Sequence, residues 1–205
     1  MYGEAMKKTI TLIELIIAVS LLAVMVLGAV SFDAASGGFL RSSERKTQVL
    51  NELTHIANHF SSYISLATGD KNNIGMITPS LTSLRIRADI SNGITRRPNE
   101  TPNDYTDDLW VQYRIDGNNL EFCSNFNVGS GVCDIGWEAL TQRFVDLGFS
   151  FSDPAANNGI VSITNLALRY SPLLAQDSRD NPQATMTDTG GSPTISFYSL
   201  SHSWN

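Results

Sequence analysis

The sequence predicts an α+β fold in which one long N-terminal helix packs on an antiparallel β-sheet. No proline precedes Pro79, and all seven prolines lie in the rest of the chain. Because proline disrupts the interior of a helix, the first part of the chain can form an unbroken one. Apolar residues recur at helical spacing before about residue 68 and alternate with polar residues beyond about residue 80. A helix followed by a series of strands indicates the α+β class.

The chain has 205 residues, of which 42% are hydrophobic and 17% are charged. This length fits one domain, or one domain with an anchor, and the composition is typical of a folded protein rather than a disordered one. The net charge is −6, and the nearest candidates for a basic cluster are isolated pairs, Arg85 with Arg87 and Arg96 with Arg97. Nucleic-acid binding requires clustered basic side chains, so no nucleic-acid partner is expected.

Residues 10–32 are apolar almost without interruption. At about 1.5 Å per residue in a helix, this segment is long enough to cross a hydrocarbon core about 30 Å thick. We therefore expect residues 10–32 to form a transmembrane helix. An ordinary secretory signal peptide, with the tripeptide Ala29-Val30-Ser31 as its cleavage site, is the alternative interpretation.

Residues 33–68 are predicted to continue the helix as an amphipathic half. Apolar residues follow one another at intervals of three or four positions, which places them on one face of the helix: Val49, Leu53, Ile56, Phe60 and Ile64. Charged and amide side chains lie between them and should face solvent. The apolar face should cover one face of the sheet, and Gly69 is expected to end the helix.

Strands are expected from about residue 80, within a sheet domain that comprises residues 69–205. Apolar and polar residues alternate over 84–90 and 111–115, which is typical of half-buried strands. The turn at residues 116–119 predicts a hairpin. Further strands are predicted over residues 144–151, 160–170 and 194–200. Residues 137–142 are expected to form a short helical turn, and residues 176–192 a polar loop.

The two cysteines, Cys123 and Cys133, lie ten positions apart in a stretch rich in Gly, Asn and Ser. A zinc site needs about four ligands, usually in closely spaced pairs, and nothing in the sequence completes one. In an exported domain, the two cysteines would form one disulfide that closes a small loop. Two free cysteines are the alternative.

Glu14 is a carboxylate inside the apolar segment. A charge at such a position costs about 2.5–3.5 kcal/mol on membrane-insertion scales, so a carboxylate that stays there usually has a partner. A cation beside it would be attracted strongly in a medium of low dielectric constant, whereas each charge alone would be costly to bury. The alternative is that Glu14 lies close enough to the interface to stay hydrated, because Lys8 is only six positions away.

The residues around Glu14 form a recognisable pattern. Thr11-Leu12-Ile13-Glu14-Leu15 follows Lys7 and Lys8 and opens the apolar segment. This arrangement resembles the N-terminal signature of type IV prepilins, which consists of a short basic leader, a cleavage site, an apolar residue and then Thr-Leu-Ile-Glu-Leu. The match has no gap, and an apolar run of the right length follows it.

The resemblance implies a role for each residue of this region. Residues 1–9 would be a leader, a prepilin peptidase would cut between Thr9 and Ile10, and Ile10 would become the N-methylated terminus. Glu14 would neutralise that terminal amine, its own or that of a neighbouring subunit, and so set the register between subunits. Thr9 stands where the family pattern has glycine, and Met6 is an alternative start of the leader.

The resemblance also implies a pilin-like lollipop fold and a single-pass location in the bacterial cytoplasmic (inner) membrane, with the C-terminal domain outside. The chain would then assemble, as a minor pilin or pseudopilin, into a type IV pilus-like or type II secretion fibre. The expected partners are other pilin or pseudopilin subunits, the prepilin peptidase, the inner-membrane assembly platform and the membrane. A looser similarity to J-type pseudopilins and W-type minor pilins, carried by residues 113–120, 137–140 and 144–149, implies a position at or near the fibre tip.

The sequence contains no pattern typical of an enzyme, neither a glycine-rich phosphate loop nor a nucleophile motif, so no catalytic activity is expected. His55 and His59 lie one helical turn apart but lack a third ligand, and no metal site is expected there. Calcium bound by the oxygen-rich stretches 103–108 and 177–181 is an alternative to solvated turns. The alternative function is a membrane-tethered binding module or adhesin that uses the loops around 91–109 and 171–193.

Overall fold

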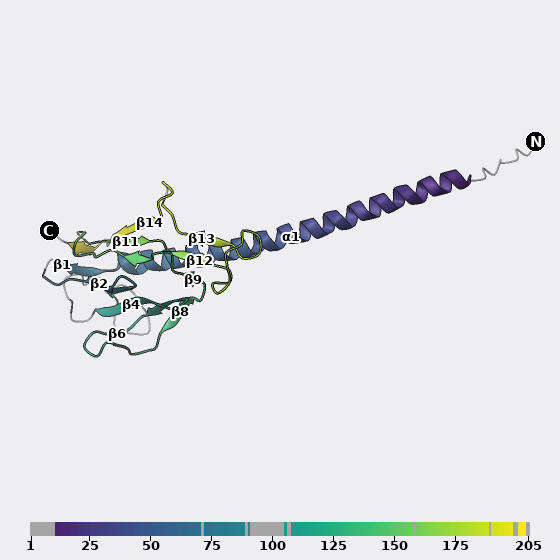
Figure 1. Cartoon of the computed structure of the whole chain (residues 1–205). Coiled ribbons are helices and arrows are strands. Elements are labelled where there is room, and N and C mark those ends of the chain that lie inside the picture. Colours follow the sequence, from purple (N-terminus) through teal and green to yellow (C-terminus); the bar gives the residue numbers. More distant parts are fainter. Residues whose placement is uncertain are drawn as a thin grey trace, which may run out of the picture. The chain divides into compact units, whose positions relative to one another are not determined.

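The computed structural model describes residues 11–70, 72–88, 90, 105, 108–157, 159–188, 190–198 and 201–203. These residues form one long helix, α1 (Leu12–Ser65), and a series of short strands that pair mostly antiparallel (Figure 1). The predicted α+β class is confirmed. The chain divides into two compact units, residues 1–43 and 44–205, and α1 contributes to both.

In the first unit, α1 begins at Leu12 and presents apolar side chains around its whole circumference. These side chains are exposed along the whole segment, including Leu12 at its start (74% exposed) and Phe32 at its end (75% exposed). By its length and composition, this part of α1 is able to span a membrane. A long apolar N-terminal helix, as expected from residues 10–32, is therefore present.

In the second unit, α1 buries one face against the strands. The buried residues are the predicted set with Tyr63 added: Val49, Leu53, Ile56, Phe60, Tyr63 and Ile64. The helix ends at Ser65, slightly before the expected position, because Thr68 already belongs to strand β1 (Thr68–Asp70). The last turn closes with the amide N–H of Leu66, which donates to the carbonyl of Tyr63 at 3.2 Å.

The largest sheet has five antiparallel strands in the order β2-β3-β4-β5-β8. They are β2 (Met76–Ser80), β3 (Ser83–Ala88), β4 (Leu109–Asp116), β5 (Asn119–Cys123) and β8 (Glu138–Thr141). The predicted hairpin is confirmed, since the turn Gly117-Asn118 joins β4 to β5. Gly117 has a φ of +59°, a conformation that glycine adopts without steric cost.

The remaining strands form smaller sheets. One has the order β10-β11-β14, with β10 (Ser150–Phe151), β11 (Ile160–Thr164) and β14 (Thr194–Tyr198). Another has the order β13-β12-β9, with β13 (Gln183–Thr185), β12 (Ala167–Arg169) and β9 (Phe144–Val145). Strands β6 (Phe126–Asn127) and β7 (Val132–Cys133) pair as a hairpin, and β1 pairs in parallel with β15 (Ser201–Ser203).

Four secondary-structure predictions were wrong in detail. Residues 137–142 contain strand β8 instead of a helical turn, because they pair with β5. The strand predicted over 144–151 is two strands in different sheets, interrupted at Gly148 with a φ of +82°. The strand predicted over 160–170 divides into β11 and β12 at Asn165, whose φ is +54°. The loop predicted over 176–192 contains the short strand β13.

An aromatic cluster joins α1 to two of the sheets. The ring of Phe60 in α1 lies 4.4 Å from Tyr113 of β4, 5.8 Å from Phe151 of β10 and 6.4 Å from Phe197 of β14, measured between ring centres. Phe60, Tyr113 and Phe151 are almost completely buried. Aromatic rings contribute large buried areas and favour such tilted contacts, so this cluster fixes how α1 lies on the strands of the second unit.

Candidate functional site

The N-terminal end of α1 brings Thr11 and Glu14 together. The backbone N–H of Thr11 donates to Oε2 of Glu14 at 2.8 Å, and the Thr11 hydroxyl donates to the same oxygen at 3.0 Å. In return, the backbone N–H of Glu14 donates to Oγ1 of Thr11 at 3.3 Å. This reciprocal arrangement is a capping box, in which a hydroxyl residue precedes the helix and an acid lies three positions later. It satisfies N–H groups that the first turn of a helix otherwise leaves without partners.

The carboxylate of Glu14 stands among exposed apolar side chains. Leu12, Ile13 and Leu15 beside it are 74%, 69% and 54% exposed. Both hydrogen bonds from Thr11 go to Oε2, and among the described residues no hydrogen bond or ion pair reaches Oε1. One oxygen of Glu14 is thus hydrogen-bonded within the helix, and the other has no partner among the described residues.

The expected processing site lies outside the described residues. Thr9 and Ile10, between which the cleavage is predicted, precede Thr11, where the description begins. Cleavage between them and N-methylation of Ile10 therefore stay predictions. The helix begins only two residues after Ile10, so a terminus at Ile10 would lie within a few residues of the Glu14 carboxylate along the chain.

Polar contacts hold α1 to the strands of the second unit. Arg45 donates through Nη1 to the carbonyl oxygen of Asp180 at 2.6 Å, and its guanidinium lies 5.1 Å from the ring centre of Tyr170. Arg143 lies 4.9 Å from the same ring and forms an ion pair with Glu52 of α1 at 3.4 Å. The ring of Tyr170 therefore contacts one arginine of the helix and one of the strand region, so the loop after β12 is anchored to α1.

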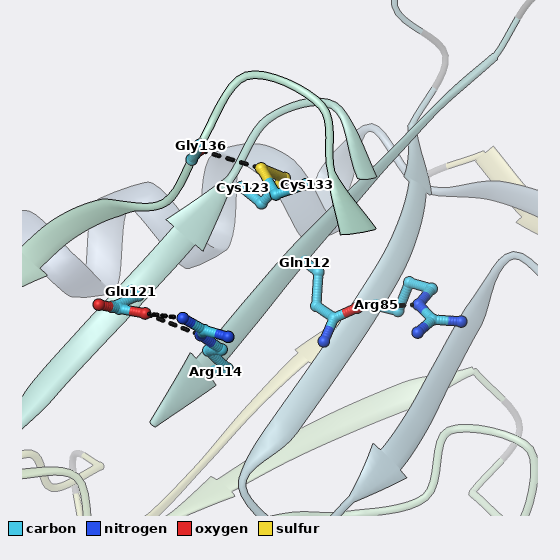
Figure 2. Close-up of a disulfide and its surroundings, with 7 residues drawn as sticks. All are labelled: Arg85, Gln112, Arg114, Glu121, Cys123, Cys133 and Gly136. Carbon is cyan, nitrogen blue, oxygen red and sulfur yellow. Dashed lines mark hydrogen bonds and ion pairs between the residues drawn. A yellow bond between two sulfur atoms is a disulfide. The ribbon is translucent and has the colours of Figure 1, made fainter. Parts of the chain in front are cut away.

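One face of the five-stranded sheet carries the side chains of Arg85 and Arg114, and aromatic rings cover this arginine layer. The guanidinium of Arg85 lies 4.4 Å from the ring centre of Phe126, and that of Arg114 lies 3.8 Å from Trp137. Arg114 also donates through Nε to Glu121 at 2.7 Å (Figure 2). Burial lowers the pKa of Arg85. This face of the sheet is therefore covered by the β6–β7 hairpin and Trp137 of the same chain.

A disulfide joins Cys123 and Cys133, as expected from their spacing (Figure 2). Their Cα atoms are 5.9 Å apart, a separation typical of disulfides. Cys123 ends β5 and is completely buried, whereas Cys133 lies in β7. The bond thus ties the β6–β7 hairpin to the central sheet, where it packs against Trp110 and Trp137. Its role is structural.

The two histidines lie in different surroundings. Nδ1 of His59 lies 2.9 Å from the hydroxyl of Tyr113, and its ring lies 4.6 Å from that of Phe122. Tyr113 is completely buried, and burial raises its pKa well above the ordinary value. His55 is exposed, with its ring centre 6.4 Å from that of His59. Within the described residues, no group of three His, Cys, Asp or Glu side chains is placed to hold a metal ion.

The two stretches considered for calcium differ in how much is described. In 177–181, Oδ1 of Asp177 accepts from the backbone N–H groups of Arg179 and Asp180 at 2.7 and 3.3 Å, which lowers the pKa of Asp177. This is the geometry of a self-capped turn. In 103–108, only Tyr105 and Asp108 are described, and the Tyr105 hydroxyl donates to Asp70 at 3.1 Å. The calcium prediction for that stretch falls largely outside the described residues.

Sequence reasoning identified Glu14 but missed the part played by Thr11. The spacing Thr11-x-x-Glu14 is itself the signal of a capping box, and it precedes an apolar helical run. The arginine layer was also missed, because Arg114 and Trp137 come together only when β5 and β8 pair. Comparisons of the chain with protein-family models, with curated proteins and with solved structures find no match.

Proposed function

We propose that this chain is a non-enzymatic minor pilin or pseudopilin, a subunit that assembles through its N-terminal helix into a type IV pilus-like or type II secretion fibre. The observation that carries the proposal is the carboxylate of the exposed residue Glu14, which Thr11 caps on Oε2 and which has no described partner on Oε1, at the head of an exposed apolar helix. A charge at such a position is costly unless it meets a cation. The helix needs apolar surroundings, and the carboxylate needs a positive partner.

Both needs are met if α1 lies first in the inner membrane and then among the helices of other subunits. Helices packed side by side exclude water from the apolar side chains of residues 12–32. The N-terminal amine at Ile10, of the same chain or of a neighbour, supplies the cation for Oε1 of Glu14. In a medium of low dielectric constant, this attraction is strong, and it selects the register in which each amine meets a carboxylate. The second unit, residues 44–205, remains outside the membrane.

The test separates the charge of Glu14 from its capping role. Glu14→Gln keeps an oxygen that accepts from Thr11, because glutamine also completes a capping box, but it removes the charge. Glu14→Leu removes both. Ser20→Ala is the matched control, since Ser20 is a polar residue of the same apolar segment whose hydroxyl donates to the carbonyl of Ile16 within the helix. The measurement is the fraction of the chain found in sheared fibres of its own host, at equal membrane levels.

We expect Glu14→Gln and Glu14→Leu to reduce the fibre fraction at least about tenfold, the factor that corresponds to losing about 1.4 kcal/mol of interaction. Ser20→Ala should assemble like the parent chain. If Glu14→Gln assembles normally and only Glu14→Leu fails, the cap rather than the charge is needed. If both variants behave like the parent, the helix is only a tether, and a membrane-anchored binding module becomes the better explanation.

A further inference from the structure

The interior of α1 contains two consecutive glycines, Gly37 and Gly38, directly after Ser36. Apart from proline, glycine is the residue least favourable to a helix interior, because its backbone loses the most conformational freedom when it becomes helical. Sharp bends in helices occur mainly at proline, at glycine and serine pairs, and at local bulges. Since no proline precedes Pro79, this segment is by its composition a weak point of α1.

Packing within the chain does not require either glycine. A Cβ atom built at Gly37 or at Gly38 meets no atom of the described residues within 4 Å, apart from adjacent residues and the nearby backbone of α1 itself. An alanine would therefore fit at both positions and would favour the helix more than glycine does. What the two glycines give the helix is conformational freedom rather than space for a neighbouring group.

The helix around the glycines also lacks a buried face. Residues 33–44 are all exposed or half-buried, and Phe39 directly after the glycines is 73% exposed. In the second unit, by contrast, Arg45 of α1 bonds to Asp180, and buried side chains begin at Val49. Helices in proteins owe most of their stability to the packing of one face. The glycine pair therefore lies where this source of stability is weak.

Charged side chains along α1 do not bridge the glycines. On a helix surface, residues three or four positions apart are neighbours, and opposite charges at that spacing stabilise the helix. Residues 35–36 before the pair and 39–40 after it are uncharged. The charged residues that flank them, Asp33 and Arg41, are eight positions apart, too far to meet along the helix.

We propose that Gly37 and Gly38 form a hinge in α1, at which the helix bends between its apolar segment and the part that packs on the strands. A hinge consists of a few residues whose φ and ψ angles change while the elements on either side keep their structure. Here the two sides are residues 12–36 and 39–65. The hinge itself rests on the composition and packing of α1 and does not depend on the proposed function.

The proposed function gives the hinge a use. In a membrane the bilayer sets the direction of the apolar segment, whereas in a fibre the neighbouring helices set it. A bend at the glycines would allow residues 44–205 to keep their own contacts while the apolar segment changes direction between these two surroundings. This use rests on the proposed function, so it is tested separately from the hinge.

The first test is amide hydrogen exchange of the full chain, dispersed in detergent, with and without the combined changes Gly37→Ala and Gly38→Ala. In a helix, the amides of residues 38–42 bond to the carbonyls of residues 34–38, across the glycines. They should exchange at least about tenfold faster in the parent chain than in the double variant, because alanine disfavours opening of the helix. Gly28→Ala makes the same change within the apolar segment and should leave these rates unchanged. Equal rates in the parent chain and the double variant would overturn the hinge.

The second test is whether the two sides of the hinge move as one body. Residual dipolar couplings of residues 12–36 and 39–65 should require two alignment tensors of different magnitude in the parent chain and a single tensor in the double variant. A single tensor for the parent chain would overturn the hinge and indicate that the glycines leave room for another helix instead. Two tensors in both forms would overturn the assignment of the bend to Gly37 and Gly38.

The use of the hinge in assembly is tested in the host with the same double variant. Its fraction in sheared fibres should fall at least about tenfold at equal membrane levels, because the bent form becomes rarer by that factor. Ser20→Ala is again the control. A double variant that has lost the bend but enters fibres like the parent chain would overturn this use. If the parent chain forms no fibres, the proposed function fails, and the exchange rates and couplings still decide whether the hinge exists.

Discussion

Thr11 and Glu14 cap the first turn of α1 reciprocally, through hydrogen bonds of 2.8 and 3.0 Å from Thr11 to the carboxylate and 3.3 Å from the Glu14 amide back to the hydroxyl. The same residues lie in the segment that resembles the prepilin signature. Thr11→Ala removes the hydroxyl that caps the helix, which typically costs about 1 kcal/mol. Amide exchange at residues 13–15 should therefore become about fivefold faster in detergent micelles.

Thr11→Ser is the control for this change. Serine keeps the hydroxyl and is as good an N-terminal cap as threonine, so its exchange rates should match those of the parent chain. Equal rates for the alanine and serine variants would show that the hydroxyl does not stabilise the turn. The fibre fraction of Thr11→Ala, compared with that of Glu14→Gln, measures how much of the assembly depends on the cap.

Gly75 lies where no side chain fits. A Cβ atom at this position would lie 1.6 Å from the backbone oxygen of Thr68, an atom that cannot move by changing a rotamer. Gly75→Ala should therefore lower the free energy of unfolding of the second unit by about 3 kcal/mol, the upper end of the usual cost of overpacking. Urea unfolding followed by circular dichroism measures this loss. Gly38→Ala, where nothing lies within 4 Å, should leave the transition unchanged or raise its midpoint.

The features that could be predicted from the sequence are those fixed by local spacing. The buried face of α1 follows the three- and four-residue spacing of Val49, Leu53 and Ile56, and the hairpin follows the turn at Gly117. The prediction of a helical turn at residues 137–142 was wrong because Trp-Glu-Ala-Leu favours a helix locally, whereas pairing with β5 requires a strand. The break between two strands at Asn165 was not predicted, because a single asparagine with positive φ leaves no mark on the alternation of apolar and polar residues.

The candidate site was predictable in part for the same reason. Glu14 is conspicuous because a charge interrupts an apolar run, and that anomaly can be seen without any structure. The arginine layer could not be found this way, because Arg114 and Trp137 come together only when β5 and β8 pair.

The disulfide should stabilise the cover of the arginine layer. Replacing both Cys123 and Cys133 with alanine should lower the free energy of unfolding by about 2–4 kcal/mol, because the open chain gains conformational freedom when unfolded. The loss should be largest in amide exchange of the β6–β7 hairpin, which the disulfide ties to β5. Reductant should shift the urea midpoint of the parent chain toward that of the variant and leave the variant unchanged. A variant that still responds to reductant would contradict this assignment.

Asp70 should make part of the stability depend on pH on the acid side. Its carboxylate accepts from the backbone N–H groups of Asn73 and Asn72, each at 2.7 Å, and these bonds lower the pKa of Asp70 below its ordinary value. A carboxyl with a lower pKa in the folded state binds fewer protons there than in the unfolded state. Its stabilising effect is therefore complete above the unfolded pKa of about 3.9 and is lost as the pH falls through the folded value.

Asp70→Asn isolates this contribution. The asparagine oxygen can still accept from Asn73 and Asn72, but it carries no charge, and Nδ2 cannot accept from the Tyr105 hydroxyl as Oδ2 of Asp70 does, so the urea midpoint near pH 7 should fall. Below about pH 4, the variant should lose stability less steeply than the parent chain, because one carboxyl that must be protonated is gone. Asp177→Asn provides a second case, since the pKa of Asp177 is lowered in the same way by the N–H groups of Arg179 and Asp180. If the stability of the parent and of both variants falls equally steeply below about pH 4, these turns persist when their carboxylates are protonated.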